Sequence, residues 1–410
     1  MTTTAAGSAT PESPGPAGGL RALWLTETYP PSRGGMAHSC DRIVRGLRRH
    51  GVTVDVLHFT ARPRGRPWTI EQQAGGRYLC CPIEHDPAHA LNRAWSVLAA
   101  DPDTRALTHV VAFGGSRPIA TAPVLAAWLG VPLLTLIRGN DFDAAVFSIR
   151  RRPILDDALT RSAIVCAVSQ DKVEKIAALH PGVRVRRIPN GIELRDWAFA
   201  PSDLARARAW REATVAPGAR VLGLFGALKA KKGGVLLLEA LRRSGAIESF
   251  HLLLAGWIEP EMDAWLTDHA GQARFTALPF LDRFELMPWY AACEWIAVPS
   301  FYDGLPNVLI EAAALGVPLL AARAGGMADV LEDGRTALLF EPGDEADCGW
   351  ALHRAAHLDE PRRLAMSAAC RELAHAELSA ELEIARYIEA LSDSRPAAGA
   401  VAVAARTARA

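Results

Sequence analysis

Two carboxylates flank a predicted helix start in the C-terminal half of the chain. Asp303 and Glu311 are eight residues apart. Between them, Pro306 suits the first position of a helix, because its ring presets φ and its missing N–H is not needed there. The N–H groups of Asn307 and Val308 would then have no partner inside the helix and would lie at the positive end of its dipole. Such a helix start binds anions and suits a diphosphate.

The residues around this helix start allow two interpretations. Gly304 lets a ligand approach the backbone closely, and Gly316 and Pro318 predict the end of the helix. Alternatively, the segment is an ordinary helix start in which Asp303 is a local cap and Glu311 is solvated.

A second loop, residues 226–234, carries three lysines between glycines. It follows a predicted strand, Val221–Phe225, and precedes a helix that begins at Val235. A fixed ammonium group beside a leaving diphosphate stabilises the charge that develops on it, and Lys232 is the candidate for this role. The alternative is a solvated lysine cluster, although cations at a helix start oppose the dipole unless an anion is bound.

The segment from Pro299 to Gly316 closely resembles the donor-site motif of the retaining glycosyltransferases of family four, or glycosyl transferases group 1. In that motif a proline–serine pair is followed by glutamate–glycine–hydrophobic–proline, and a second glutamate comes eight residues after the first. Asp303 stands where the first glutamate usually stands, so its carboxylate is one methylene shorter. The residues that match are Pro299, Ser300, Gly304, Pro306, Glu311, Ala312 and Gly316.

The lysine-rich loop resembles the family's glycine-arginine-leucine, three residues, lysine-glycine segment. Ala227 occupies the arginine position, so Lys229 or Lys231 would have to cover for the absent arginine. The matching residues are Gly226, Leu228, Lys232 and Gly233.

Two loops of the N-terminal half resemble further parts of the family's cleft. Gly34-Gly35 resembles a glycine pair that faces the donor phosphates and the acceptor, although a tight turn explains it equally well. Arg138 stands where the family often has histidine, so the histidine's role is not carried over. We expect Arg138 to bind an anionic acceptor or support the donor phosphate, and Asp141, beside Asn140, to orient an acceptor hydroxyl. A structural pair between Arg138 and Asp141 is the alternative.

The resemblance implies an enzyme that transfers a sugar from a nucleotide-diphosphate sugar to a hydroxyl acceptor with retention. Asp303 would contact the sugar, Glu311 the ribose hydroxyls, and Phe280 and Leu281 the base. No acidic metal cluster and no protein nucleophile are apparent, so we expect metal-independent front-side attack without a cofactor. The expected donor-binding residues are Gly34, Gly35, Gly226, Lys229, Gly304, Leu305, Pro306, Asn307, Val308 and Glu311, with Asp303, Lys232 and Arg138 as catalytic residues.

Other functions stay open at this point. A nucleotide-sugar epimerase or a phosphorylase could use the same fold, and a non-catalytic member could bind sugar or lipid. The base, the sugar and the acceptor (a glycan, a lipid-linked sugar or a small molecule) do not follow from the motifs. No nucleic-acid partner is expected.

Strands and helices alternate twice along the chain, which predicts an α/β fold of two doubly wound domains. The resemblance implies the GT-B fold, in which two Rossmann-like domains face each other across a cleft. By this resemblance we expect an acceptor-side domain at 20–197, a donor domain at 198–375, and a helix at 376–393 that crosses back to the first domain. Residues 1–19 and 394–410 are expected to be loose tails.

Charge and cysteine content bear on the environment of the protein. The net charge is zero, yet residues 1–200 hold 24 Lys and Arg against 17 Asp and Glu. A basic surface of this kind, with Arg150–Arg152 included, either accompanies phosphorylated or membrane-borne acceptors or is simply solvated. Seven cysteines without C-x-x-C pairs and the absence of a long apolar run predict a cytoplasmic protein, with peripheral contact at the inner membrane face if the acceptor is lipid-linked.

Overall fold

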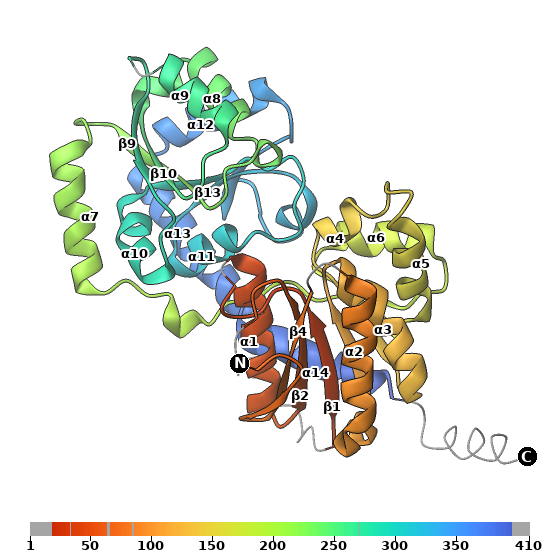
Figure 1. Ribbon diagram of the computed structural model, residues 1–410. Coiled ribbons are helices and arrows are strands. Elements are labelled where there is room, and N and C mark those ends of the chain that lie inside the picture. The colour runs from red at the N-terminus through yellow and green to blue at the C-terminus, as the bar shows by residue number, and fades with distance from the viewer. Residues whose placement is uncertain (1–18, 33, 64–65, 84–85, 270, 396–410) are drawn as a thin grey trace, which may run out of the picture.

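The computed structural model describes residues 19–32, 34–63, 66–83, 86–269 and 271–395, which form two α/β halves (Figure 1). Almost all of the two predicted tails lies outside these residues. None of the helices in the described part of the chain is both long and apolar enough to cross a membrane.

The first half is built on an eight-stranded sheet in the order β3-β4-β2-β1-β5-β6-β7-β8. All neighbours pair in parallel except β3, which pairs antiparallel with β4 at one edge. The central strands β5 and β6 are buried along their whole length and mostly apolar, because helices cover both faces. The strands are β1 (Arg21–Thr26), β2 (Thr53–Thr60), β3 (Ile70–Gln73), β4 (Gly76–Pro82), β5 (His109–Phe113), β6 (Leu133–Ile137), β7 (Ile164–Ala167) and β8 (Val185–Arg187). The helices are α1 (Gly35–Arg49), α2 (Pro87–Ala100), α3 (Ser116–Leu129), α4 (Asn140–Asp143), α5 (Arg152–Arg161) and α6 (Gln170–Leu179).

The second half is built on a fully parallel six-stranded sheet in the order β11-β10-β9-β12-β13-β14. The predicted domain boundary near residue 198 falls in the segment between β8 and the first strand of this sheet. The strands are β9 (Arg220–Phe225), β10 (Phe250–Ala255), β11 (Arg274–Leu278), β12 (Trp295–Val298), β13 (Leu319–Ala322) and β14 (Ala337–Phe340). The helices are α7 (Pro201–Thr214), α8 (Gly234–Arg243), α9 (Pro260–Asp268), α10 (Arg283–Ala292), α11 (Asn307–Leu315), α12 (Glu345–His357), α13 (Glu360–Glu377) and α14 (Ala380–Asp393).

Helix α14 returns from the second half and packs on α1 of the first (Figure 1). Its apolar face, including Ile384 and Tyr387, belongs to the core of the first half. Gly46 on α1 lets α14 approach closely, because a Cβ there would lie 2.5 Å from the Ile384 side chain, which would have to shift. Arg42 of α1 donates to the buried carboxylate of Glu383 at 2.8 Å. The last helix is therefore part of the first core.

Two local predictions differ from the structure. Helix α11 begins at Asn307, and Pro306 is its N-cap, with φ −64° and ψ 136°. The sequence also predicts that Ala324-Gly325-Gly326 leads into a helix at 327–331. The structure has a single 3-10 turn there, Gly325–Met327, followed by further turns. Both differences arise at glycine- or proline-rich segments, where local sequence fixes the turn but not its exact end.

Candidate active site

The carboxyl ends of the two sheets face a pocket of about 360 Å³ between the halves. Most of its lining follows β1, β5 and β6 of the first sheet, and Lys231 and Asp303 come from the second. This is where open α/β sheets bind ligands, since loops from several strands converge there. The lining residues from the first half that carry polar side chains are Glu27, Ser116, Arg138, Asn140, Asp141 and Arg151.

Lys232 and Asp303, which are 71 residues apart, form an ion pair from Nζ to Oδ2 at the edge of this pocket. The two loops that carry these residues are also in close backbone contact. A Cβ at Gly233 would lie 2.0 Å from the carbonyl oxygen of Pro299, and the N–H of Phe301 donates to the Lys231 carbonyl at 3.0 Å. The two residues predicted to act on sugar and diphosphate are thus brought together.

The start of α11 offers two backbone donors. The N–H of Leu309 is bonded to the Pro306 carbonyl at 3.1 Å. Within the described residues, the N–H groups of Asn307 and Val308 have no hydrogen-bond partner. They are available to an anion, as the sequence predicted, and the helix dipole favours one there.

Glycines allow the two halves to approach at this point. The side chain of Asn307 donates to the Gly35 carbonyl at 3.3 Å, and a Cβ at Gly35 would lie 2.7 Å from the same nitrogen. A Cβ at Gly304 would lie 2.9 Å from the carbonyl oxygen of Arg138. Gly325, at φ +50°, has no room either, since a Cβ would meet the Asp303 carbonyl at 1.9 Å. The predicted donor loop is therefore in contact with loops of the first half.

The Arg138 guanidinium binds other side chains of the protein. It donates to the Tyr387 hydroxyl at 2.9 Å and to Asn190, and it lies 3.9 Å from the buried carboxylate of Glu383. Asn190 in turn donates to the Leu305 carbonyl at 2.8 Å. The guanidinium, predicted to bind an anionic acceptor or the donor phosphate, instead links the segment between the halves, α14 and the donor loop.

Asp141 holds the loop that contains Arg138. Its carboxylate accepts the backbone N–H groups of Arg138, Gly139 and Phe142 at 2.7–3.1 Å. Burial raises the pKa of Asp141, while these three hydrogen bonds lower it. The alternative interpretation, a pair within the loop, therefore holds for the backbone of Arg138 and not for its guanidinium. Asn140 lines the pocket beside it.

Glu311 lies one turn into α11, where the Tyr290 hydroxyl donates to its carboxylate at 2.7 Å. Burial raises the pKa of Glu311 from 4.5 to about 7, against the lowering effect of this hydrogen bond and of the Arg42 charge. A carboxyl group with a pKa near 7 can lose its proton close to neutral pH, and the carboxylate can then accept hydrogen bonds from a ligand.

Family models match both halves of the chain. "Glycosyl transferase 4-like domain" matches residues 34–191 and "Glycosyl transferases group 1" matches residues 219–357. The chain belongs to the group 1 glycosyltransferase family. It is similar to D-inositol 3-phosphate glycosyltransferases of Corynebacterium kroppenstedtii (31% identical, covering 41% of this chain and 40% of the relative) and Nocardia farcinica (30% identical, covering 63% and 57%). The chain thus spans about half the length of the curated relatives it matches.

Solved structures confirm the predicted GT-B fold. Anabaena Alr3699/HepE in complex with UDP and glucose matches with a TM-score of 0.72 at 18% identity, covering 91% of this chain and 99% of that one. Sucrose-phosphate synthase from Thermosynechococcus elongatus matches with a TM-score of 0.73 at 20% identity over the same shares. At these identities the likeness concerns the fold alone.

The remaining predicted residues of this group 1 family member lie outside the pocket lining. Phe280 is 53% exposed and Leu281 is half-buried, both between β11 and α10. Lys229 is exposed on the loop after β9. Gly226, at φ +102°, faces the side chain of Val308, which a Cβ would meet at 3.9 Å. Their roles at the donor stay predictions.

Sequence reasoning missed several side chains around the site. Glu27 follows β1 directly and accepts the N–H of Arg117 at 2.9 Å, and both its position after a strand and its charge could have singled it out. Asn190 and Tyr290 gave no such signal, because their roles depend on partners more than 20 residues away.

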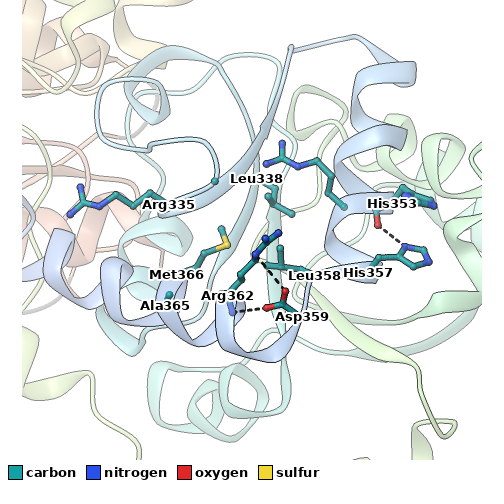
Figure 2. A pocket seen from close by; sticks show the side chains of 11 residues that line it. Arg335, Leu338, His353, His357, Leu358, Asp359, Arg362, Ala365 and Met366 are labelled. Atoms are coloured by element: carbon teal, nitrogen blue, oxygen red, sulfur yellow. Dashed lines mark hydrogen bonds and ion pairs between the residues drawn. The ribbon is translucent and has the colours of Figure 1, made fainter.

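A larger pocket of about 720 Å³ lies elsewhere on the second half (Figure 2). It opens at the amino end of β14, around Leu338, and so at the end of the sheet opposite the ligand-binding edge. Its arginines already meet carboxylates: Arg335 donates to Glu332 at 2.9 Å, and Arg362 lies 3.4 Å from Asp359. The pocket between the halves is therefore the better candidate for the active site.

Proposed function

We propose that the protein is a glycosyltransferase that moves a sugar from a nucleoside diphosphate sugar to a hydroxyl group of an acceptor. Two observations carry this proposal: the ammonium group of Lys232 is paired with Asp303, and the N–H groups of Asn307 and Val308, at the start of the helix that follows, have no hydrogen-bond partner among the described residues. An ammonium and aligned backbone donors are what a leaving diphosphate requires, because negative charge develops on its oxygens as the sugar departs.

In the proposed reaction, the bond between the anomeric carbon and the diphosphate oxygen breaks, and its electron pair stays on the diphosphate. The acceptor hydroxyl attacks from the same face and forms the new bond to the anomeric carbon. Because the new bond forms on the face from which the diphosphate departs, the configuration is retained, and the proton of the hydroxyl passes to a phosphate oxygen. Asp303 would contact the sugar, and Lys232 would supply the positive charge that a metal ion supplies elsewhere.

The donor is proposed to lie along α11 of the second half. Glu311 would accept the ribose hydroxyls, and the base would lie toward Phe280 and Leu281, with Gly34 and Gly35 closing over the phosphates. Uridine diphosphate is the first nucleotide to test, since the similar HepE structures hold UDP and UDP-glucose.

The acceptor is proposed to occupy the 360 Å³ pocket on the side of the first half. Arg151 lines this pocket, and its guanidinium has no ion-pair partner among the residues that the structure describes. An acceptor that carries phosphate would supply one, which is consistent with relatives named for D-inositol 3-phosphate. Arg138 is not proposed for this task, because its guanidinium is already engaged.

A panel of nucleotides tests the proposed function. UDP should raise the Tm by several degrees at about 100 times its Kd, which corresponds to about 2.7 kcal/mol of stabilisation, and GDP, ADP and TDP should raise it less. Incubation of the protein with UDP-sugars and candidate acceptors, with and without EDTA, then follows transfer and the anomeric configuration of the product by NMR. A Tm that none of the four nucleotides changes would contradict the proposal, and donor consumption without any acceptor would indicate an epimerase.

Donor binding should weaken as the pH falls through about 7. The raised pKa of Glu311 means that its contribution to folding stability is complete below pH 4.5 and is lost as the pH rises through 7. The affinity for the donor changes with pH in the opposite direction and increases as the pH rises, because only the ionised carboxylate accepts hydrogen bonds from both ribose hydroxyls. The Kd for UDP-glucose should rise about tenfold between pH 8 and pH 6.

Calorimetry with UDP-glucose measures this effect cleanly, because its diphosphate has no group that titrates near pH 6, unlike the terminal phosphate of UDP. Glu311→Gln is the matched variant, and its Kd should vary little over the same range. A wild-type Kd that is the same at both pH values would remove Glu311 from the donor site.

A further inference from the structure

The segment between α4 and α5, residues 144–151, displays two bulky apolar side chains to solvent. Phe147 is 91% exposed and Ile149 is 95% exposed. Among the large hydrophobic residues in the described part of the chain, these are the two most exposed. Together with Ile154, which is 41% exposed, they gather exposed apolar surface in one short stretch of the chain. Grouped exposed apolar side chains, unlike scattered ones, mark interaction sites, because each gains free energy when it leaves water.

This segment is held in place by the fold. Ala145 on one side and Leu155 on the other are buried in the core of the first half. Between them, the N–H of Ser148 donates to the Ala145 carbonyl at 3.0 Å, and the N–H of Arg152 donates to the Ser148 carbonyl at 2.8 Å. The turns are hydrogen-bonded, so the apolar side chains project from a defined frame.

The same segment is strongly basic. Arg150, Arg151 and Arg152 are all exposed and follow Ile149 directly. Arg152 lies 3.6 Å from Asp156 on the next turn, while Arg150 and Arg151 have no carboxylate partner among the described residues. Exposed apolar side chains next to unpaired cations are the combination that binds anionic lipid surfaces, where insertion and electrostatic attraction add.

The segment also borders the pocket between the halves. Ala145, Arg151 and Ile154 line that pocket together with Lys231 and Asp303. We propose that residues 147–152 dock on an anionic lipid bilayer and bring the pocket to an acceptor carried in that bilayer. The acceptor part of this inference rests on the proposed function. A bilayer is favoured over a second copy of the chain because a protein partner at this segment would need its own carboxylates to match Arg150 and Arg151, which have none among the described residues.

Vesicle sedimentation of the full chain tests the docking. The protein should bind vesicles that contain phosphatidylglycerol, bind phosphatidylcholine vesicles weakly, and dissociate as salt is added. Phe147→Ser with Ile149→Ser should reduce binding at least tenfold, and Arg150→Glu should reduce it only on the anionic vesicles. The matched control, Leu364→Ser with Arg362→Ser on α13, changes an exposed apolar and basic pair and should bind like the wild type.

The outcomes separate docking from catalysis. The Tm and its increase with UDP should be unchanged in the Phe147/Ile149 variant, since both side chains are exposed. A wild-type protein that ignores anionic vesicles while its Tm responds to UDP would overturn the docking alone. Vesicle binding without any response to nucleotide would overturn the proposed function alone. A wild-type dimer that the variant turns into a monomer, without vesicle binding, would show that the segment binds a second copy instead.

Discussion

Lys232→Ala should lower kcat at least about a hundredfold, a loss of about 3 kcal/mol in transition-state stabilisation, while the protein stays folded. Lys232 forms an ion pair with Asp303, which lines the pocket, and this pair holds the ammonium group at the pocket edge. Without Lys232, the departing diphosphate would lose the ammonium group that an ion pair with Asp303 fixes at the pocket edge. Steady-state kinetics with the donor identified by the nucleotide panel measures the effect.

A control variant that removes a lysine outside the site shows whether the effect on kcat depends on the position of the charge. Lys175→Ala removes an exposed lysine of α6 that pairs with Asp171, and should leave kcat unchanged. Lys232→Ala also leaves the Asp303 carboxylate without its cation, where it would repel a diphosphate. Comparing the double variant Lys232→Ala/Asp303→Asn with Asp303→Asn alone distinguishes the two effects, since these two variants differ only in the ammonium group and neither carries the repelling carboxylate. A kcat within threefold of wild type in Lys232→Ala would exclude the lysine from the reaction.

Glu383→Ala should reduce the free energy of unfolding by about 3–5 kcal/mol, because it leaves buried guanidinium groups without their counter-charge. The Glu383 side chain is 1% exposed. It lies 2.8 Å from Arg42 on α1 and 3.9 Å from Arg138, whose side chains are 11% and 2% exposed. Urea denaturation, with the m-value compared, measures the loss.

A second glutamate of α14 provides the control. Glu389 is 64% exposed and lies 4.0 Å from Arg186, so Glu389→Ala should cost about 1 kcal/mol at most. Equal losses in the two variants would mean that the buried network contributes no more than a surface ion pair. A loss confined to Glu383→Ala would establish that α14 is fastened to the first half by charge as well as by apolar packing.

Local features of the site could be predicted from the sequence. The N–H groups at the start of α11 follow from a proline before an apolar helix, and the position of Lys232 follows from glycines around a loop after a strand. Even here the helix begins one residue later than expected, at Asn307, since a proline fixes φ equally well at the N-cap.

The partners of side chains across the fold could not be predicted. The sequence places Arg138 at a strand end but does not indicate that Asn190 and Tyr387, 52 and 249 residues away, would bind its guanidinium. Likewise the pKa of Glu311 is raised by burial and lowered by the hydrogen bond from Tyr290, which lies on another helix. Such contacts depend on how helices of both halves pack, which local propensity does not specify.

The central claim is that Lys232 and the first amides of α11 bind the donor diphosphate, and a crystal soaked with UDP-glucose tests it most directly. The account predicts diphosphate density within hydrogen-bond distance of the Lys232 ammonium and of the N–H groups of Asn307 and Val308, with the ribose at Glu311. Density for the diphosphate at any other place, such as the pocket of Figure 2, with Lys232 still bound only to Asp303, would contradict it.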